Sequence, residues 1–383
     1  MRLAHLRLRS FRAHDATEVD LAEGVNLFAG PNGAGKTNLL EAIHYLSLGK
    51  SFLTSSDAHV VQRGEAHFEV EGSFVGERRP SLTVRVVVVP GEGKRAFVNG
   101  APLDRLADLV GQVPTVVIAP ADADLTAGGP TERRRFLDTT LSQAYPVYLD
   151  DLIKYRRALR QRNALLQSVR RGKALAPGTM DAWDEELAVL GARIIGRRAE
   201  FLQGFSDRLG EAYQLLDAVG EVPSLTYAPS VTDSDGEGVE GFRAVLRRRS
   251  RRERDLGRTL VGPHLDEVVF QLDGFDLRPY ASQGQHRTFA LALRIAQALF
   301  FRDHLDETPI LMLDDVFGPL DPERADVVLG LLGEQTLGQS LITAARTEPF
   351  WDAVPFDRSE HSAFHVERGL VDRLSSIPTA SPA

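Results

Sequence analysis

Residues 30–37 read GPNGAGKT, the clearest functional signal in the chain. The stretch fits the pattern Gly-x-x-x-x-Gly-Lys-Thr at every fixed position. Residues 24–30 (GVNLFAG) before it are typical of a buried strand, and residues 36–49 (KTNLLEAIHYLSLG) carry apolar side chains at helical spacing. A strand, a glycine-rich loop and a helix in this order predict a phosphate-binding P-loop.

The residues of this loop have physical tasks in binding ATP. Backbone N–H groups close around phosphate oxygens where glycine leaves room, and the helix N-terminus adds partial positive charge. Lys36 is expected to reach the β- and γ-phosphates, and the Thr37 hydroxyl to hold Mg²⁺. The expected ATP-binding residues of the loop are Gly30, Pro31, Asn32, Gly33, Ala34, Gly35, Lys36, Thr37 and Asn38. A glycine turn with a chance lysine is the alternative, which the flanking elements disfavour.

A second metal-binding carboxylate is expected at the end of a neighbouring strand, and residues 309–317 (PILMLDDVF) supply it. Asp314 follows four apolar residues and is expected to bind Mg²⁺ together with Thr37. Asp315 is expected to orient or deprotonate the attacking water, which makes it a catalytic residue alongside Lys36. A pair of exposed carboxylates capping a strand is the alternative. Because the two motifs are far apart in the chain, an insertion must separate the two halves of one ATP-binding head.

The strand and helix patterns predict an α/β P-loop ATPase head with an antiparallel β subdomain and an inserted helical domain. Residues 1–125 are expected to form the N-terminal half of the head, 126–256 the inserted helical domain, 257–372 the C-terminal half and 373–383 a disordered tail. Alternating runs between residues 67 and 98 indicate an antiparallel meander.

The insertion is expected to contain two long helices and one loop. Apolar residues between 187 and 216 step mostly by three, four or seven, which predicts one long helix packed along one face. A second helix over about 146–171 is expected to pair with it. The acidic, glycine-containing segment 231–241 (VTDSDGEGVEG) has no apolar pattern and is expected to be a mobile loop.

Composition favours a cytoplasmic protein without a membrane span. The 383 residues are 43% hydrophobic and include no cysteine, which excludes disulfides and thiolate metal sites. The apolar stretch 289–301 is short and is interrupted by Arg294. The net charge is −8, yet residues 131–256 hold 22 Lys and Arg against 19 Asp and Glu, while the remainder holds 23 against 34. The predicted insertion is therefore the basic part of the chain.

Residues 282–285 (SQGQ) precede a predicted helix and the carboxylate strand, and they resemble the Ser-Gly-Gly-Gln signature of ATP-binding-cassette ATPases. Further blocks resemble those of the RecF family of recombination-repair ATPases, in the same order and across nearly the whole chain. These blocks are SFRAH, GPNGAGKTNLLEAIHYLSLGKSF, APADADLTAGGPTERRRFLD, VGPHLDE, YASQGQHRT and LMLDDVFGPLD. The resemblance implies an ABC/SMC-like ATPase head.

The resemblance also implies a function. RecF-family proteins dimerise on ATP, hydrolyse it weakly in a DNA-dependent manner, and act in DNA replication, recombination, repair and the SOS response. With RecO and RecR they assist loading of RecA at gapped DNA. The cofactors implied are ATP and Mg²⁺, and the partners are DNA, a second copy of the chain, RecO and RecR directly, and RecA indirectly.

In the superfamily, the signature of one subunit contacts the γ-phosphate held by the P-loop of the other. This gives Ser282, Gly284 and Gln285 an implied ATP-binding role, and it places Asp321 in a loop that crosses the dimer interface. A hydroxyl, a glycine-opened backbone and a helix N-terminus suit an anion. The alternative is local, because Ser282 is also a suitable N-cap whose capping box Gln285 would complete.

The chain departs from the family pattern at several positions. Leu53 stands where an arginine is expected, and residues 265–267 (LDE) stand in place of Arg-Asp-Asp, which puts a DNA or nucleotide role for these blocks in doubt. Asp315 replaces the glutamate of the general cassette family, and the shorter carboxylate fits slow turnover. No glutamine follows VIAPADAD and no histidine follows SLITAAR, where Thr343 is the nearest polar candidate for that switch.

Three arginine-rich groups are candidates for contacts with DNA phosphates, which add salt-dependent affinity without sequence specificity. They are Arg133–Arg135, the set Lys154, Arg156, Arg157, Arg160 and Arg162, and residues 247–254 (RRRSRRER). A solvated helix face is an equally good interpretation of any one group. Aromatic residues are sparse among them, which favours backbone binding to duplex or junction DNA over base stacking.

Two other classes of protein compete with an ATP-gated DNA clamp. A transporter cassette is disfavoured by the basic insertion and the missing glutamine loop, and a structural chromosome protein by the shortness of the helical insertion. His361 and His365 have helical i, i+4 spacing but lie in an alternating segment, so a surface position on a sheet edge is expected in place of a metal site.

Overall fold

The computed structural model describes residues 1–216, 220–318, 322–334, 336–351 and 353–374. Its contacts divide the chain into two compact units. Unit 1 holds Met1–Asp122, the segment that starts at Glu211 and the segment that starts at Arg287, and unit 2 holds Ala123–Gly210 and Gly220–His286. The chain therefore leaves unit 1 to build unit 2 and returns to it twice.

Residues 257–286 lie in unit 2, whereas the sequence patterns place them in the C-terminal half of the head. The reason is a strand pairing that those patterns do not reveal. β10 (Glu267–Leu272) pairs antiparallel with β9 (Pro223–Ala228) on one side and with β11 (Phe275–Asp276) on the other. Because β9 belongs to unit 2, its partner strand lies there too.

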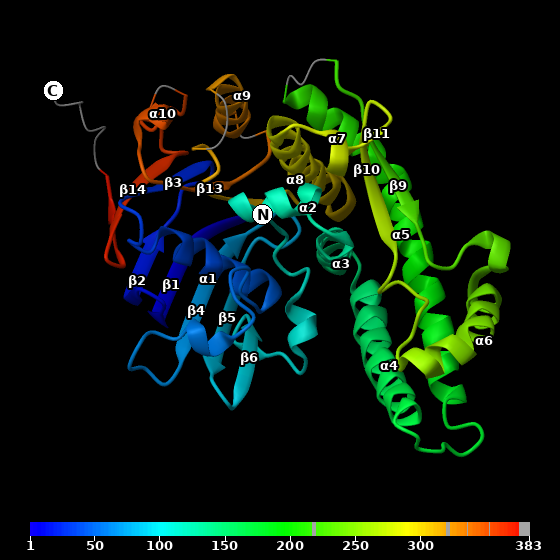
Figure 1. Ribbon diagram of the computed structural model, residues 1–383. Coiled ribbons are helices and arrows are strands. Elements are labelled where there is room, and N and C mark those ends of the chain that lie inside the picture. Colours follow the sequence, from blue (N-terminus) through cyan, green and yellow to red (C-terminus); the bar gives the residue numbers. More distant parts are fainter. Residues whose placement is uncertain (217–219, 319–321, 335, 352, 375–383) are drawn as a thin grey trace. The chain divides into compact units, whose positions relative to one another are not determined.

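A six-stranded sheet of unit 1 carries the P-loop and has the strand order β15-β14-β3-β13-β12-β8 (Figure 1). Neighbouring strands pair in parallel, except that β15 forms an antiparallel hairpin with β14. The strands are β3 (Val25–Ala29), β8 (Thr115–Ile118), β12 (Ile310–Asp314), β13 (Ser340–Ala344), β14 (Ser362–Glu367) and β15 (Leu370–Arg373). Every residue of β3, β12 and β13 is buried, as is typical of a parallel sheet covered on both faces.

A second six-stranded sheet of unit 1 is antiparallel, in the order β2-β1-β4-β5-β6-β7. Its strands are β1 (Arg2–Phe11), β2 (His14–Asp20), β4 (Phe68–Val75), β5 (Leu82–Val89), β6 (Gly93–Val98) and β7 (Ala101–Pro102). β4 and β5 alternate between buried and half-buried residues, which confirms the predicted meander. β2 was not predicted, because exposed Asp15, Glu18 and Asp20 leave it little apolar signal.

Helix α1 (Lys36–Leu48) lies between these two sheets and contacts β1, β4 and β5 of one and β12 and β13 of the other. Eleven of its thirteen residues are buried, so it has no solvent-facing polar side. Its interior polar groups are bonded inside the protein. Glu41 accepts two hydrogen bonds from Arg12, at 2.7 and 2.8 Å, and Ser47 Oγ donates to Val113 O at 2.7 Å.

Unit 2 is mainly helical. Its helices are α2 (Ala123–Ala127), α3 (Pro130–Ala144), α4 (Pro146–Arg170), α5 (Asp181–Leu215, which ends in unit 1), α6 (Gly238–Leu256) and α7 (Leu277–Tyr280). α4 and α5 are the two long helices that the sequence predicts. Tyr145 alone separates α3 from α4, and its extended backbone is what a following proline requires.

The segment 231–241 is shorter as a loop than predicted. A single 3-10 turn forms at Asp233–Asp235, and α6 already begins at Gly238. α8 (Gln283–Leu305), α9 (Pro322–Gly333) and α10 (Glu348–Trp351) follow in the last part of the chain. Among the described residues, none of the helices is both long and apolar enough to cross a membrane.

Two buried arginines connect the helices of unit 2. Arg162 of α4 donates to Asp184 of α5 at 2.5 Å and to Glu253 of α6 at 2.6 Å. Arg198 of α5 donates to Asp138 of α3 at 2.8 Å. Both side chains are almost fully buried, and a buried charge is stable only where such partners neutralise it.

We expect two glycines of α5 to respond oppositely to replacement by alanine. A Cβ at Gly191 would lie 2.3 Å from the Phe242 ring, whereas one at Gly204 would meet nothing within 4 Å. Gly204→Ala should stabilise the protein by about 0.5–1 kcal/mol through helix propensity. Gly191→Ala should destabilise it by about 1–3 kcal/mol through overpacking against α6. Thermal and urea unfolding measure both, and a stabilised Gly191→Ala protein would show that α5 and α6 do not pack this closely.

Candidate functional site

The P-loop joins β3 to α1, as the sequence predicts. Gly30 is required by a close approach, because a Cβ there would lie 2.1 Å from the backbone oxygen of Val366 in β14. Gly35 has φ +108°, a conformation that favours glycine. Lys36 Nζ donates to the loop's own carbonyls, Gly30 O at 2.7 Å and Pro31 O at 2.9 Å. The lysine is therefore held over the loop whose phosphate-binding role the sequence predicts.

Thr37 and Asp314 are brought together although they are distant in sequence. Thr37 Oγ1 donates to Asp314 Oδ1 at 2.7 Å. Asp314 is the last residue of β12, and β12 lies two positions from β3 in a parallel sheet, so its end faces the P-loop. A hydroxyl and a carboxylate are the oxygen ligands that Mg²⁺ prefers, and this pair fits the predicted ion.

Thr343 of β13 bonds the Asp314 carboxylate and the backbone of Asp315. Its Oγ1 donates to Asp314 Oδ1 at 2.7 Å and accepts from the Asp315 backbone N at 3.1 Å. The side chain is 1% exposed. The sequence marks this threonine only as a candidate for the histidine switch, whereas the structure shows it bonded to the predicted magnesium ligand.

Asp314 and Asp315 have different environments. Asp314 is buried and bonded, whereas Asp315 is exposed and has φ +49°, an unusual value for a residue other than glycine. Burial lowers the pKa of Lys36, and the nearby Asp315 and Asp314 carboxylates oppose this effect. The lysine, the bonded carboxylate and the exposed carboxylate therefore form one electrostatic group.

His14 was missed by the sequence analysis, although it lies in the quoted SFRAH block. Its ring joins the P-loop to the C-terminal hairpin, with Nε2 3.0 Å from Gly35 O and Nδ1 2.9 Å from Gly369 O. Burial lowers the pKa of His14, and the two backbone carbonyls oppose that effect. The Gly369 N–H also donates to Ala34 O at 2.9 Å. The hairpin is thus fixed directly to the loop.

Ser282 forms the capping box that the sequence left open as an alternative. The Gln285 N–H donates to Ser282 Oγ at 3.2 Å, and the Ser282 N–H donates to Gln285 Oε1 at 2.8 Å. Gln285 Nε2 also donates to Glu221. Gly284 lies in the first turn of α8, and Ser282 is exposed. Asp321, the remaining predicted interface residue, lies outside the described residues, as do residues 375–383 of the tail.

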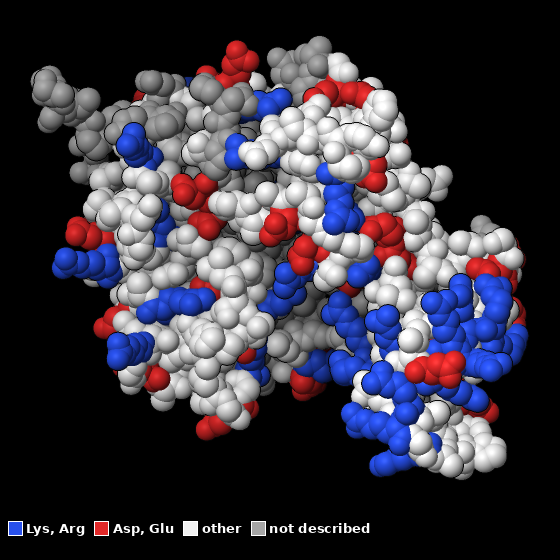
Figure 2. All heavy atoms as spheres, viewed as in Figure 1, with Lys and Arg blue, Asp and Glu red and all other residues white. Residues whose placement is uncertain are grey.

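The structure divides the predicted DNA-contact residues into buried and exposed sets. Arg133 is 6% exposed and binds both oxygens of Glu267, and Arg162 is buried with its two carboxylates, so neither is accessible to DNA. The exposed cations are Arg135 on α3 and further residues on α4 and α6, and Figure 2 shows Lys and Arg side chains gathered over α4 and α6. The prediction was therefore wrong for Arg133 and Arg162, because burial and pairing do not show in a count of arginines.

Two other expectations change. His361 is buried and its Nδ1 accepts from the Val25 N–H at 3.0 Å, so it does not lie on the surface with His365. Asp266, in the block that departs from the family pattern, is also buried. It accepts from Arg198 at 3.2 Å and from Ser230 N at 2.8 Å. These residues stabilise the fold.

A family model described as RecF/RecN/SMC N terminal domain matches residues 2–366. The DNA replication and repair protein RecF of Salinibacter ruber is 52% identical over 374 residues, which cover 96% of this chain and 91% of the relative. The chain belongs to the RecF family. RecF of Chloroherpeton thalassium is 40% identical over 355 residues, covering 91% of this chain and 96% of the relative.

Solved structures agree with membership of the RecF family. The recombination mediator protein RecF with ATP has a TM-score of 0.88 at 29% identity, covering 97% of each chain. The Smc head bound to the C-winged helix domain of ScpA has a TM-score of 0.57 at 14% identity, covering 98% of this chain and 97% of that one, which shows the fold alone. The α/β fold of an ABC/SMC-like head is thereby confirmed.

We expect Thr343→Val to weaken the use of Mg²⁺ in nucleotide binding. The valine has the same shape but removes the hydroxyl that orients Asp314, and loss of such a partner costs about 10-fold or more in metal affinity. Binding of a fluorescent ATP analogue across a Mg²⁺ titration measures the shift. Thr343→Ser, which keeps the hydroxyl, is the matched control and should stay near wild type. Identical Mg²⁺ midpoints for valine and threonine would remove Thr343 from this role.

Proposed function

We propose that this protein is an ATP-dependent DNA-binding repair protein that dimerises on ATP and hydrolyses it slowly. The observation that carries the proposal is the 2.7 Å contact of Thr37 with Asp314 beside Lys36, in a chain of the RecF family. Relatives of this family are named as DNA replication and repair proteins, and a related structure holds ATP. The proposed activity acts on chromosomal DNA and thus in the cytoplasm.

Different residues of this chain would have different roles in ATP hydrolysis. Lys36 would bind the β- and γ-phosphates once it exchanges its loop carbonyls for them. Mg²⁺ bound by Thr37 and Asp314 would neutralise phosphate charge. Asp315, exposed beside this group, would orient the attacking water or accept its proton. Since an aspartate reaches less far than a glutamate, slow turnover is the expected result.

The signature residues would complete the ATP site of a second copy. In the capping box, Ser282 Oγ only accepts a hydrogen bond, so its O–H group is still available to donate to a phosphate oxygen. The helix N-terminus adds favourable charge for the same phosphate. Capping of α8 and contact with a phosphate are therefore compatible, and Ser282 would do both.

Two substitutions of Ser282 separate capping from dimerisation. Aspartate caps a helix as well as serine does, but it would repel the γ-phosphate of the partner. Ser282→Asp should therefore bind ATP and unfold like wild type while remaining monomeric with ATP, as measured by light scattering. Ser282→Thr, which keeps the hydroxyl, should still dimerise. A stable ATP dimer of the aspartate variant would rule out the contact between subunits.

A basic face of unit 2 is the proposed DNA interface. α6 carries seven arginines against three acidic residues, and one of those acids, Glu253, is buried against Arg162. In the described part of the chain, no ion pair involves the exposed Arg247, Arg249, Arg251, Arg252 and Arg254. Exposed arginines without carboxylate partners suit DNA phosphates.

Two arginines of α6 should contribute to DNA affinity in a salt-dependent way. Arg249→Gln combined with Arg252→Gln should lower the slope of log affinity against log salt by roughly 1 to 2, uniformly across DNA sequences. Arg243→Gln on the same helix is the matched control, because Arg243 is already paired with Glu185. Fluorescence anisotropy with duplex and junction DNA, with and without ATP, measures this. Unchanged slopes in the double variant would place DNA elsewhere.

RecO and RecR are the proposed protein partners, with assistance of RecA loading at gapped DNA as the proposed outcome. The support is the family resemblance together with the related structures, which are of a recombination mediator protein in the RecFOR pathway.

A further inference from the structure

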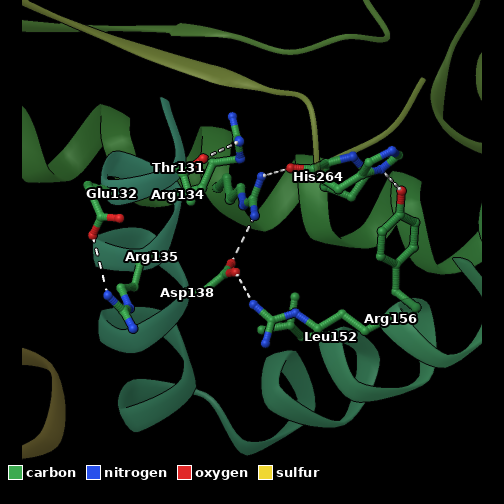
Figure 3. Close-up of a pocket in the computed structure, with 11 residues that line it drawn as sticks. Thr131, Glu132, Arg134, Arg135, Asp138, Leu152, Arg156 and His264 are labelled. Atoms are coloured by element: carbon green, nitrogen blue, oxygen red, sulfur yellow. Dashed lines mark hydrogen bonds and ion pairs between the residues drawn. The ribbon is translucent and has the colours of Figure 1, made fainter. Parts of the chain in front are cut away.

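A pocket of about 440 Å³ opens within unit 2 between α3, α4 and the segment before β10 (Figure 3). Four arginines line it against two carboxylates, Glu132 and Asp138. Arg134 and Arg135 come from α3 and Arg156 from α4, while Arg198 reaches in from α5. The lining therefore carries an excess of positive charge.

The two carboxylates of the pocket are already engaged. Asp138 accepts from Arg198 at 2.8 Å and from Arg156 at 2.7 Å. Glu132 lies 3.4 Å from Arg135 in an exposed i, i+3 pair. An exposed pair of this kind contributes little energy, so Arg135 is easily released to another anion.

Among the residues that the structure describes, no carboxylate is in hydrogen-bond contact with Arg134. Its Nη1 donates to the backbone oxygen of Asp266 at 2.8 Å, and its Nη2 to Thr131 Oγ1 at 3.4 Å. Burial lowers the pKa of Arg134, and so does the charge of Arg198. The Glu267, Asp266 and Asp138 carboxylates act in the opposite direction. A half-buried guanidinium bonded to neutral oxygens gains free energy when an anion binds beside it.

The floor of the pocket is already rigid. The Tyr155 hydroxyl lies 2.7 Å from His264 Nδ1, and Arg198 is fixed between Asp138 and Asp266. Burial lowers the pKa of His264 to about 4, so the ring is neutral at pH 7 and shares one hydrogen bond with the tyrosine. A ligand would thus bind against Tyr155, His264 and Arg198 without having to order these side chains.

We propose that this pocket binds a phosphate group, with Arg134 and Arg135 as its main ligands. Arginine forks pair with phosphate oxygens in two-point contacts, and the excess positive charge matches an anion. The favoured source is a DNA backbone, which makes this inference rest on the proposed DNA binding. Arg157 and Arg160 of α4 are also exposed, so the helix that lines the pocket carries further cations for a phosphate chain. A free phosphate compound is the other source of the same chemistry.

The test compares the full-length protein with an Arg134→Gln, Arg135→Gln double variant. The control is Arg193→Gln, an exposed arginine of α5 that pairs with Asp151 outside the pocket. Inorganic phosphate is the first probe, added with saturating ATP so that the P-loop is already occupied, and a rise in melting temperature at constant ionic strength reports its binding to the pocket. Duplex DNA is the second probe, with affinity measured by anisotropy over a salt series with ATP present.

A phosphate site on DNA predicts two losses in the double variant. The salt slope should fall by roughly 1, and the protection by inorganic phosphate should vanish, while the control keeps both. Loss of protection with an unchanged slope supports the phosphate site and assigns it to a free compound. The proposal would be overturned if the double variant kept the wild-type salt slope and inorganic phosphate did not protect the wild-type protein.

A single substitution gives a second test of the pocket. Arg135 is 74% exposed, so Arg135→Gln alone should fold and still lose part of the protection if the double variant proves unstable. Failure of the proposed function looks different from failure of the pocket. In the first case the wild-type protein binds no DNA while inorganic phosphate still protects it. In the second case the α6 variants lose salt slope, the pocket variant does not, and inorganic phosphate gives no protection.

Discussion

Helix α1 is enclosed by two sheets, and most of unit 1 depends on this enclosure. A helix without a solvent face must satisfy every polar side chain from within the protein. Glu41 is bonded to Arg12 and Ser51, and Ser47 to Val113. The same enclosure fixes the first turn, so Lys36 and Thr37 project from a rigid base. An ATP site built on such a helix is positioned by packing more than by the loop itself.

The sequence predicted the parts of the site that follow from local pattern. Strand, glycine loop and helix identify the P-loop, and a buried apolar run ending in carboxylates identifies Asp314. Their closeness also follows, because parallel strands end at one edge of a sheet. His14 and Thr343 were not predictable in their observed roles. A single histidine or threonine has no pattern, and each role arises only where segments from distant parts of the chain meet.

The burial of charged side chains is even harder to predict from sequence than the roles of His14 and Thr343. A count of arginines treats all of them alike, but in unit 2 some hold helices together and others face solvent. Arg162 is buried because Glu253, 91 residues away, arrives on the face of α6 that packs against α4. Arg247, Arg249 and Arg252, on the same helix as Glu253, have no carboxylate partner among the described residues. Burial depends on which helices meet, and that information is not local.

The position of β3 has a consequence for how the protein is made. β3 is sandwiched between β13 and β14, with Val25 opposite Ser340 and Asn26 opposite Ser362. The antiparallel sheet comes from one continuous N-terminal segment and can assemble while the ribosome is still at work. The strand that leads into the P-loop must wait until β13 and β14 have been synthesised before its neighbours exist. During that time one apolar side of α1 has no sheet to cover it, and such a nascent chain is a natural client for a chaperone.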